Sequence, residues 1–297
     1  MRRSLGTRVF DLGNNIFMMF LCVITLYPYI NQLAIALNEG KDTAFGGITI
    51  FPRKFTLANL ELVFQNSQFF NGMFVSVSRV VVATIIVLIV TTAAAYGLSR
   101  KYLPFKNVLL GVLIIPGYIS VGLVPTFILF KYLGLINNFW VYVLPRAFSF
   151  YNMLIIMSFL RGLPDELEES AIIDGANEVQ VFFKIIIPLS TPVLATIALW
   201  TAVDHWNDWI TTLLFVTERK LYTIQYLLMQ VVKESETLQA ALSEASITGG
   251  GIRDVAMPTP EAVRSATFVI ATLPIMLVYP FMQRYFVKGI VLGAVKG

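Results

Sequence analysis

Long segments without a charged residue constrain the fold of this 297-residue chain more than any other feature. A helix that crosses a bilayer needs about 20 consecutive, mostly apolar residues. Charge-free segments that can each supply such a helix are residues 12–38, 80–99, 107–130, 185–203 and 265–283. Residues 138–160 form a sixth apolar segment, which contains Arg146.

The sequence therefore predicts an all-α, polytopic membrane protein with six transmembrane helices. Only 13% of the residues are charged, whereas soluble domains carry about 25%. An open sheet would leave backbone groups unpaired in lipid, and barrel strands would alternate over about 10 residues. The predicted spans cover residues 14–37, 72–98, 108–131, 138–160, 189–216 and 264–286. Prolines within these spans are expected to bend the helices: Pro116, Pro125, Pro145, Pro192 and Pro274.

Basic residues at the helix ends predict that both termini are cytoplasmic. This divides the chain into a cytoplasmic amino terminus (1–13), a transmembrane domain (14–286) and a cytoplasmic tail (287–297). A secretory signal is an alternative for the first span, but its apolar run exceeds the 7–15 residues of a signal core. The net charge of +4 is explained by basic cytoplasmic ends, so nucleic-acid binding is not expected. The lone Cys22 excludes an intrachain disulfide.

Two external segments are long enough to have a function. Residues 38–71 are expected to contain a short amphipathic helix at 57–64. Residues 217–263 are expected to contain a helix at 221–245, followed by a glycine- and proline-rich tip. The tip either docks a protein partner outside the membrane or is a simple connector.

The polar segment 161–188 lies between two spans and predicts an amphipathic helical hairpin. Pro164 can begin a helix, and the acidic residues after it are stabilised by the positive amino-terminal end of the helix dipole. Gly175 can close this helix with a positive φ, and Asn177 can cap a second one. Helices that lie on a membrane surface usually have a basic polar face. Because this polar face is acidic, a groove on a soluble partner suits it better.

The hairpin also resembles the cytoplasmic coupling loop of permease subunits in binding-protein-dependent ABC importers. Glu169-Ser170-Ala171, Gly175, Ile185 and Ile187-Pro188 fit the spacing E-A-A-x3-G-x9-I-x-L-P, with Ser170 for Ala and Ile187 for Leu. Residues 163–171, 205–209, 285–289 and 293–297 resemble the carbohydrate-importer permeases of the MalG-like group, nearest the LplC/YtcP type. This likeness extends over nearly the whole chain.

The resemblance implies a bacterial inner-membrane importer whose partners are a second, different permease, two copies of a cytosolic ATPase and an extracytoplasmic sugar-binding protein. The substrate would be an oligosaccharide, and membrane lipid would surround the helices. The tail residues Lys296 and Gly297 would touch the ATPases. The residues expected to couple to the ATPase are Glu168, Glu169, Ala171, Asp174, Gly175, Ala176, Phe182 and Phe183.

The chain has no phosphate-binding loop of the type G-x4-G-K-[ST]. ATP and Mg²⁺ are therefore expected on the partner ATPase, and no cofactor or enzymatic activity is expected on this chain. An integral membrane enzyme is disfavoured because no catalytic motif was found. A secondary carrier driven by an ion gradient is the alternative function, although internal inverted repeats are not evident.

Polar and aromatic residues near the outer end of the fifth span are candidates for the substrate pathway: Trp200, Asp204, His205, Trp206, Asn207, Asp208 and Trp209. Interfacial anchoring is the alternative role for the tryptophans. His205 lacks a second His or Cys ligand, so no metal site is expected. A hydrogen-bonding role within the helix is expected for His205. Arg146 is a further candidate, which could pair with an acidic sugar such as a uronate of the alginate type. Arg79 and Arg264 either face a cavity or partner, as charges within a span usually do, or reach the outer headgroups.

Overall fold

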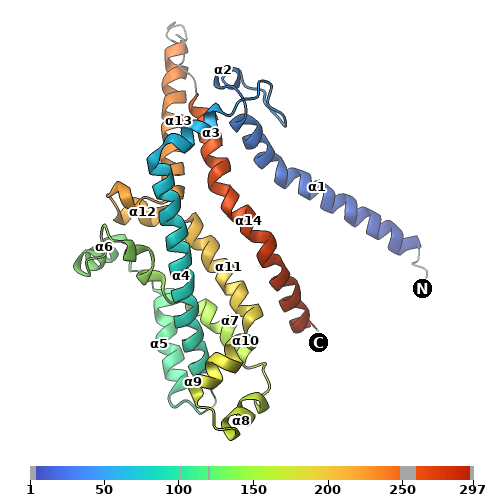
Figure 1. The fold of residues 1–297 in the computed structure, drawn as a ribbon, viewed down its shortest axis with the longest axis vertical. Helices are drawn as coiled ribbons and strands as arrows, with labels where there is room; N and C mark the ends of the chain where they lie inside the picture. Colours follow the sequence, from blue (N-terminus) through green and yellow to red (C-terminus); the bar gives the residue numbers. More distant parts are fainter. Residues whose placement is uncertain (1–4, 101, 120, 248–258, 295–297) are drawn as a thin grey trace. The chain divides into compact units, whose positions relative to one another are not determined.

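The computed structural model describes residues 5–100, 102–119, 121–247 and 259–294, and this part of the chain is helical. It contains no strand, and Asn38 and Phe55 form an isolated antiparallel bridge. The all-α prediction is confirmed. Figure 1 traces the order of the elements.

The amino-terminal elements are α1 (Leu5–Ala36), α2 (Gly40–Thr43), α3 (Ala58–Gln65), α4 (Ser67–Ser99), α5 (Lys106–Tyr118) and α6 (Leu123–Tyr132). The central ones are η1 (Phe139–Tyr142), η2 (Leu144–Arg146), α7 (Phe150–Leu160), α8 (Glu166–Ile173), α9 (Glu178–Val181), the π-helical η3 (Phe182–Ile186) and α10 (Ile187–Leu189). The remaining ones are α11 (Thr191–Asn207), α12 (Ile210–Phe215), η4 (Arg219–Leu221), α13 (Ile224–Ile247) and α14 (Pro260–Ala294).

Three of the described helices, α1, α4 and α14, contain a segment long and apolar enough to cross a membrane. Three bent helix pairs pass the same test, and six spans result if each pair is one span. These pairs are α5 with α6, η1–η2 with α7 (bent by 50°), and α9–α10 with α11 (bent by 77°).

The structure divides each of the predicted spans 108–131, 138–160 and 189–216 into shorter helices, and the prolines within these spans predicted such bends. Pro145 lies within η2, and Pro192 lies in the first turn of α11, so both prolines are next to a bend. A proline removes a backbone hydrogen bond and disfavours helix in the residue before it. Gly122 (φ +83°) precedes α6 in a conformation that favours glycine. The charge pattern cannot detect such breaks, since the segments stay apolar throughout.

The chain divides into two compact units, and the first comprises Met1–Phe70 with Leu227–Pro274. The helices predicted at 57–64 and 221–245 are present, as α3 and, apart from its first residues, as α13. The Asn59 amide nitrogen donates to the carbonyl oxygens of Ala36 (3.0 Å) and Asn38 (2.8 Å). The predicted glycine tip at 249–251 lies outside the described residues, as do Lys296 and Gly297 of the tail.

Asp42 joins the two ends of the segment 38–53 in this first unit. The Asn38 amide nitrogen (3.0 Å) and Arg53 Nε (2.9 Å) both donate to its Oδ2. These two hydrogen bonds lower the pKa of the Asp42 carboxyl below its ordinary value, and the one from Asn38 has the larger effect. Desolvation of the carboxyl acts in the opposite direction. The carboxylate therefore stays ionised and holds the turn together.

The second unit comprises Asn71–Tyr226 with Ile275–Gly297 and holds two apolar clusters. One cluster joins α4, α7 and α11 to the segment 181–186, through Ala95, Met153, Ile156, Val181 and Ile197. The other joins α4 to residues 135–143 and 215–216. Helices α8 and α9 lie at the end of this unit that also holds the α4–α5 connection (Figure 1). The first cluster therefore supports the predicted coupling hairpin directly.

Candidate functional site

The hairpin at 161–188 has the turn and the cap that its sequence predicts. Helix α8 ends at Ile173, and the turn after it contains Gly175, whose φ is +85°. Its amide donates to the carbonyl of Ile172 (3.0 Å), and the next amide, of Ala176, donates to Ala171 (2.9 Å). Asn177 then caps α9 by accepting from the Gln180 amide (2.9 Å), while the Gln180 side chain accepts from the Asn177 amide (3.0 Å). This reciprocal capping box explains why the second helix begins at Glu178.

The second helix of the hairpin is shorter and less regular than expected. Only Glu178–Val181 is α-helical, after which residues 182–186 widen into a π-helix before Pro188 and the bend into α11. Single π turns within α-helices are frequent at functional sites. Here the π turn lies where the hairpin joins the membrane helix.

Half of the predicted coupling residues face the protein itself. Ala171, Ala176 and Phe182 are half-buried and pack against the first apolar cluster. Glu168 is half-buried too, because its carboxylate is bound by Arg100. These four residues, Glu168, Ala171, Ala176 and Phe182, hold the hairpin to the rest of the chain. The residue types of these four gave no sign of this inward orientation.

The other four, Glu169, Asp174, Gly175 and Phe183, are exposed. Large apolar side chains are exposed beside them: Ile173 (85%), Val179 (64%), Phe183 (61%) and Ile172 (55%). Exposed apolar groups rimmed by charges mark a protein-docking surface. Sequence reasoning did not single out Ile173, which is the most exposed of these four side chains.

A charged cavity lies at the base of the hairpin. It measures about 850 Å³ and is lined by the end of α4, the α4–α5 connection and residues 160–169. Both basic and acidic groups line it, namely Arg100, Lys106, Arg161, Asp165, Glu166, Glu168 and Glu169. Sequence reasoning did not single out Arg100, because nothing local distinguishes it from other basic residues at helix ends.

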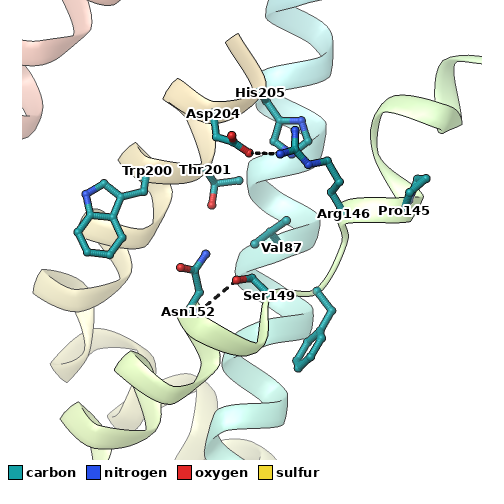
Figure 2. Close-up of a pocket in the computed structure, with 10 residues that line it drawn as sticks. Val87, Pro145, Arg146, Ser149, Asn152, Trp200, Thr201, Asp204 and His205 are labelled. Atoms are coloured by element: carbon teal, nitrogen blue, oxygen red, sulfur yellow. Dashed lines mark hydrogen bonds and ion pairs between the residues drawn. The ribbon is translucent and has the colours of Figure 1, made fainter. Parts of the chain in front are cut away.

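A second cavity, of about 410 Å³, brings several predicted pathway residues together. Figure 2 shows it between α4, α7 and α11, with the side chains of Arg146 and Asp204 directed toward each other. Arg146 Nη2 lies 2.8 Å from Asp204 Oδ2. His205, Trp200 and Asn152 line the same cavity, and the last of these was not predicted.

An ion-pair cluster continues from this cavity into the protein. Asp208 pairs with Arg79 and lies 3.6 Å from Nη1 of Arg146. Arg79 is only 1% exposed, and its guanidinium carbon lies 4.7 Å from the centre of the Tyr142 ring. Arg79 therefore faces a partner and does not reach the headgroups, since Asp208, 129 residues away in the sequence, neutralises it.

The remaining predicted pathway residues lie apart from the cavity lining. Trp206 is buried, Asn207 is exposed, and neither lines the cavity. His205 is 2% exposed, and its Nδ1 has no hydrogen-bond partner among the described residues. The described residues contain no group of three His, Cys, Asp or Glu side chains that could hold a metal ion.

Comparison with known proteins agrees with this architecture. Residues 67–292 match the family model described as "Binding-protein-dependent transport system inner membrane component". Protein LplC of Bacillus subtilis (strain 168) is 38% identical over 297 residues, which cover 100% of this chain and 98% of the relative. The polygalacturonan/rhamnogalacturonan transport system permease protein YtcP of the same organism is 35% identical over 98% of this chain and 99% of the relative.

Among solved structures, a bacterial ABC transporter involved in the import of the acidic polysaccharide alginate contains a chain with the same fold. The TM-score is 0.83 at 23% identity, with 96% of this chain and 99% of that chain covered. The family match, the relatives and the helical architecture agree with one another. This chain belongs to the inner-membrane permease components of binding-protein-dependent ABC transport systems.

Proposed function

We propose that this chain forms half of the translocation pathway of an ATP-driven importer of oligosaccharides. A second, different permease forms the other half, two copies of a cytosolic ATPase supply ATP and Mg²⁺, and an extracytoplasmic binding protein delivers the sugar. Residues 161–188 couple the pathway to the ATPase. Sugar transport is supported by relatives whose names include polygalacturonan/rhamnogalacturonan, arabinooligosaccharides and trehalose.

The exposed apolar edge of the hairpin is the observation that carries the coupling role. Ile172, Ile173, Val179 and Phe183 are exposed, and Glu169 and Asp174 lie on the same short helices. Lipid is a poor occupant of this edge, because helices on membrane surfaces place basic residues on the polar face. A groove on a soluble ATPase suits an apolar edge with acidic neighbours.

Ile173→Asp tests this assignment. The side chain is 85% exposed, so the substitution should leave the fold of the chain intact. We expect the ATPase subunits to stop co-purifying with the permease in detergent. Phe45→Asp is the matched control, because it places the same charge on an 86% exposed apolar side chain in the external segment. Unchanged co-purification with Ile173→Asp would contradict the coupling role.

Gly175→Asp provides a second test in nanodiscs, through ATP hydrolysis by the complete complex. No atom lies within 4 Å of a Cβ added at Gly175, so the turn has room for the side chain. The positive φ, which Asp tolerates better than most residues, remains the main strain. We expect assembly without stimulation of the ATPase by binding protein and sugar. Stimulation at the parental level would return the secondary-carrier alternative to consideration.

The cavity at Arg146 is the proposed point of sugar contact, together with Asp204, His205 and Trp200. An acidic oligosaccharide is the finer candidate, since a sugar carboxylate can replace Asp204 as the partner of Arg146. Arg146→Gln should then reduce uptake of oligogalacturonates more than uptake of arabino-oligosaccharides. Asp204→Asn is the matched variant, because it frees Arg146 and should shift the preference toward the acidic sugar. Equal effects on both probes would exclude acidic-sugar recognition by Arg146.

A further inference from the structure

Glu168 and Glu169 are neighbours in the sequence, yet the structure gives them different surroundings. Glu169 is exposed, whereas the side chain of Glu168 is 17% exposed and that of Arg100 is 16% exposed. Nη1 and Nη2 of Arg100 each donate to a different carboxylate oxygen of Glu168. Such two-pronged Arg–carboxylate pairs restrict the relative orientation of both groups. Arg100 directly follows the last residue of α4, so this pair ties α4 to α8.

The same arginine reaches the second half of the hairpin through aromatic rings. Its guanidinium carbon lies 4.0 Å from the centre of the Tyr96 ring, and the Tyr96 ring lies 5.0 Å from that of Phe182 in η3. Cation–π and tilted aromatic contacts at these distances are attractive. One turn of α4 therefore holds both arms of the hairpin.

The connection that follows Arg100 adds two further contacts. Tyr102 donates from its hydroxyl to Glu178 Oε1 (3.2 Å) in α9. Lys106 Nζ donates to the carbonyls of Ser99 (3.2 Å) and Arg100 (3.1 Å), which belong to the open carboxyl end of α4. The end of α4 is thereby held in a defined shape where it contacts the hairpin.

We propose that these residues form a clasp that transmits movement of the coupling hairpin to α4, with Arg100 as the positioning residue. The clasp comprises Tyr96, Arg100, Tyr102 and Lys106 with Glu168, Glu178 and Phe182. Helix α4 continues from the clasp to Val87, which lines the cavity at Arg146. Thirteen helical residues span about 20 Å. A displacement of the hairpin thus reaches the proposed sugar cavity along one unbroken helix. This inference rests on the proposed coupling function.

The test uses a reporter cysteine in the assembled complex and needs no sugar. Cys22 is the only cysteine in the sequence, so Cys22→Ser removes the background. Asn152→Cys then places one thiol in the cavity. The rate at which a charged methanethiosulfonate labels this thiol is measured without nucleotide and after trapping with ATP and vanadate. We expect trapping to change this rate in the reporter protein.

Arg100→Glu should reduce that change about tenfold, in the usual range of coupling between distant sites, while the ATPase still co-purifies and hydrolyses ATP. Glu168→Arg should do the same, and the double swap Arg100→Glu/Glu168→Arg should restore the change. Arg161→Glu is the matched control, since Arg161 lines the same cavity without a salt bridge to a described carboxylate. If Arg100→Glu fails to assemble, Arg100→Lys keeps the charge but loses the two-pronged geometry and should still weaken the change.

A full response in Arg100→Glu, or in Arg100→Lys where Arg100→Glu fails to assemble, would overturn the clasp alone. The clasp would also be overturned if the double variant Arg100→Glu/Glu168→Arg hydrolyses ATP but its labelling rate does not change on trapping. A reporter protein that never responds to nucleotide would overturn the proposed coupling function, and the clasp with it. Retained ATP hydrolysis with a lost cavity response is the signature that a merely structural role of Arg100 would not produce.

Discussion

The ion pair of Arg79 and Asp208 shows how a charge is accommodated inside the second compact unit. Asp208 accepts from Arg79 and also from the hydroxyl (2.6 Å) and amide (3.1 Å) of Thr211. Tyr142 covers the guanidinium and donates from its hydroxyl to the carbonyl of Leu221 (2.7 Å). The pair thus joins α4 to the end of α11 and to α12.

Removal of one partner should be costly, because it leaves an uncompensated buried charge. We expect Arg79→Met or Asp208→Asn to lower the free energy of unfolding by about 3–5 kcal/mol. The double variant should lose less than the sum of both changes. Thermal denaturation of the complex in nanodiscs measures this. Additive losses would mean that the two side chains do not depend on each other.

The stability of the turn around Asp42 should depend on pH. Its pKa is lowered in the folded state, so its stabilising effect is complete above the unfolded value of about 4 and is lost as the pH falls through the folded pKa. We expect pepsin to cut the segment 44–55 of Asp42→Asn faster than that of the parent at pH 5. The two rates should approach each other as the pH falls below about 4. Equal rates at pH 5 would show that Asn38 and Arg53 hold the turn without the carboxylate.

The two short helices of the hairpin depend on their caps and on packing for their stability. Helix α8 has 8 residues and α9 has 4, far below the length at which an isolated helix is stable in water. The buried Val181 and Ile186 anchor the second arm to the first apolar cluster. The capping box of Asn177 and Gln180 satisfies amides that packing cannot reach.

Asn177→Ala should therefore loosen the second arm. Loss of an N-cap costs about 1 kcal/mol, which corresponds to about fivefold faster local opening. Hydrogen exchange of the amides at 178–186 measures this opening. Asn138→Ala is the matched control, because Asn138 caps η1 in a similar way and should leave exchange in the hairpin unchanged. Unchanged protection at 178–186 in Asn177→Ala would mean that packing alone holds the arm.

Orientation in the membrane is a property of the whole molecule. The proposed coupling places the hairpin in the cytoplasm and the segment 38–71 outside. In a Cys22→Ser background, a membrane-impermeant thiol reagent added to intact cells should label Phe45→Cys but not Ile173→Cys. Both side chains are exposed, so accessibility within the protein does not limit the reaction. The reverse pattern would invert the predicted topology.

Much of this architecture follows from local patterns along the chain. Apolar length predicts the spans, and Gly175 and Asn177 predict the turn and cap of the hairpin, because these depend on a few adjacent residues. Local patterns do not reveal which neighbouring glutamate faces inward. Glu168 and Glu169 have the same chemistry, and only the position of Arg100, 68 residues earlier, separates them.

The sequence by itself determined the helical class, the membrane location and the place of the hairpin, since hydrophobic length and turn residues act over short distances. Only the tertiary structure decided that Arg79 is buried against Asp208 and that Arg146 meets Asp204 beside a cavity. Charges far apart in the chain find their partners through packing of the helices. Their pairing therefore cannot be predicted from their local sequence.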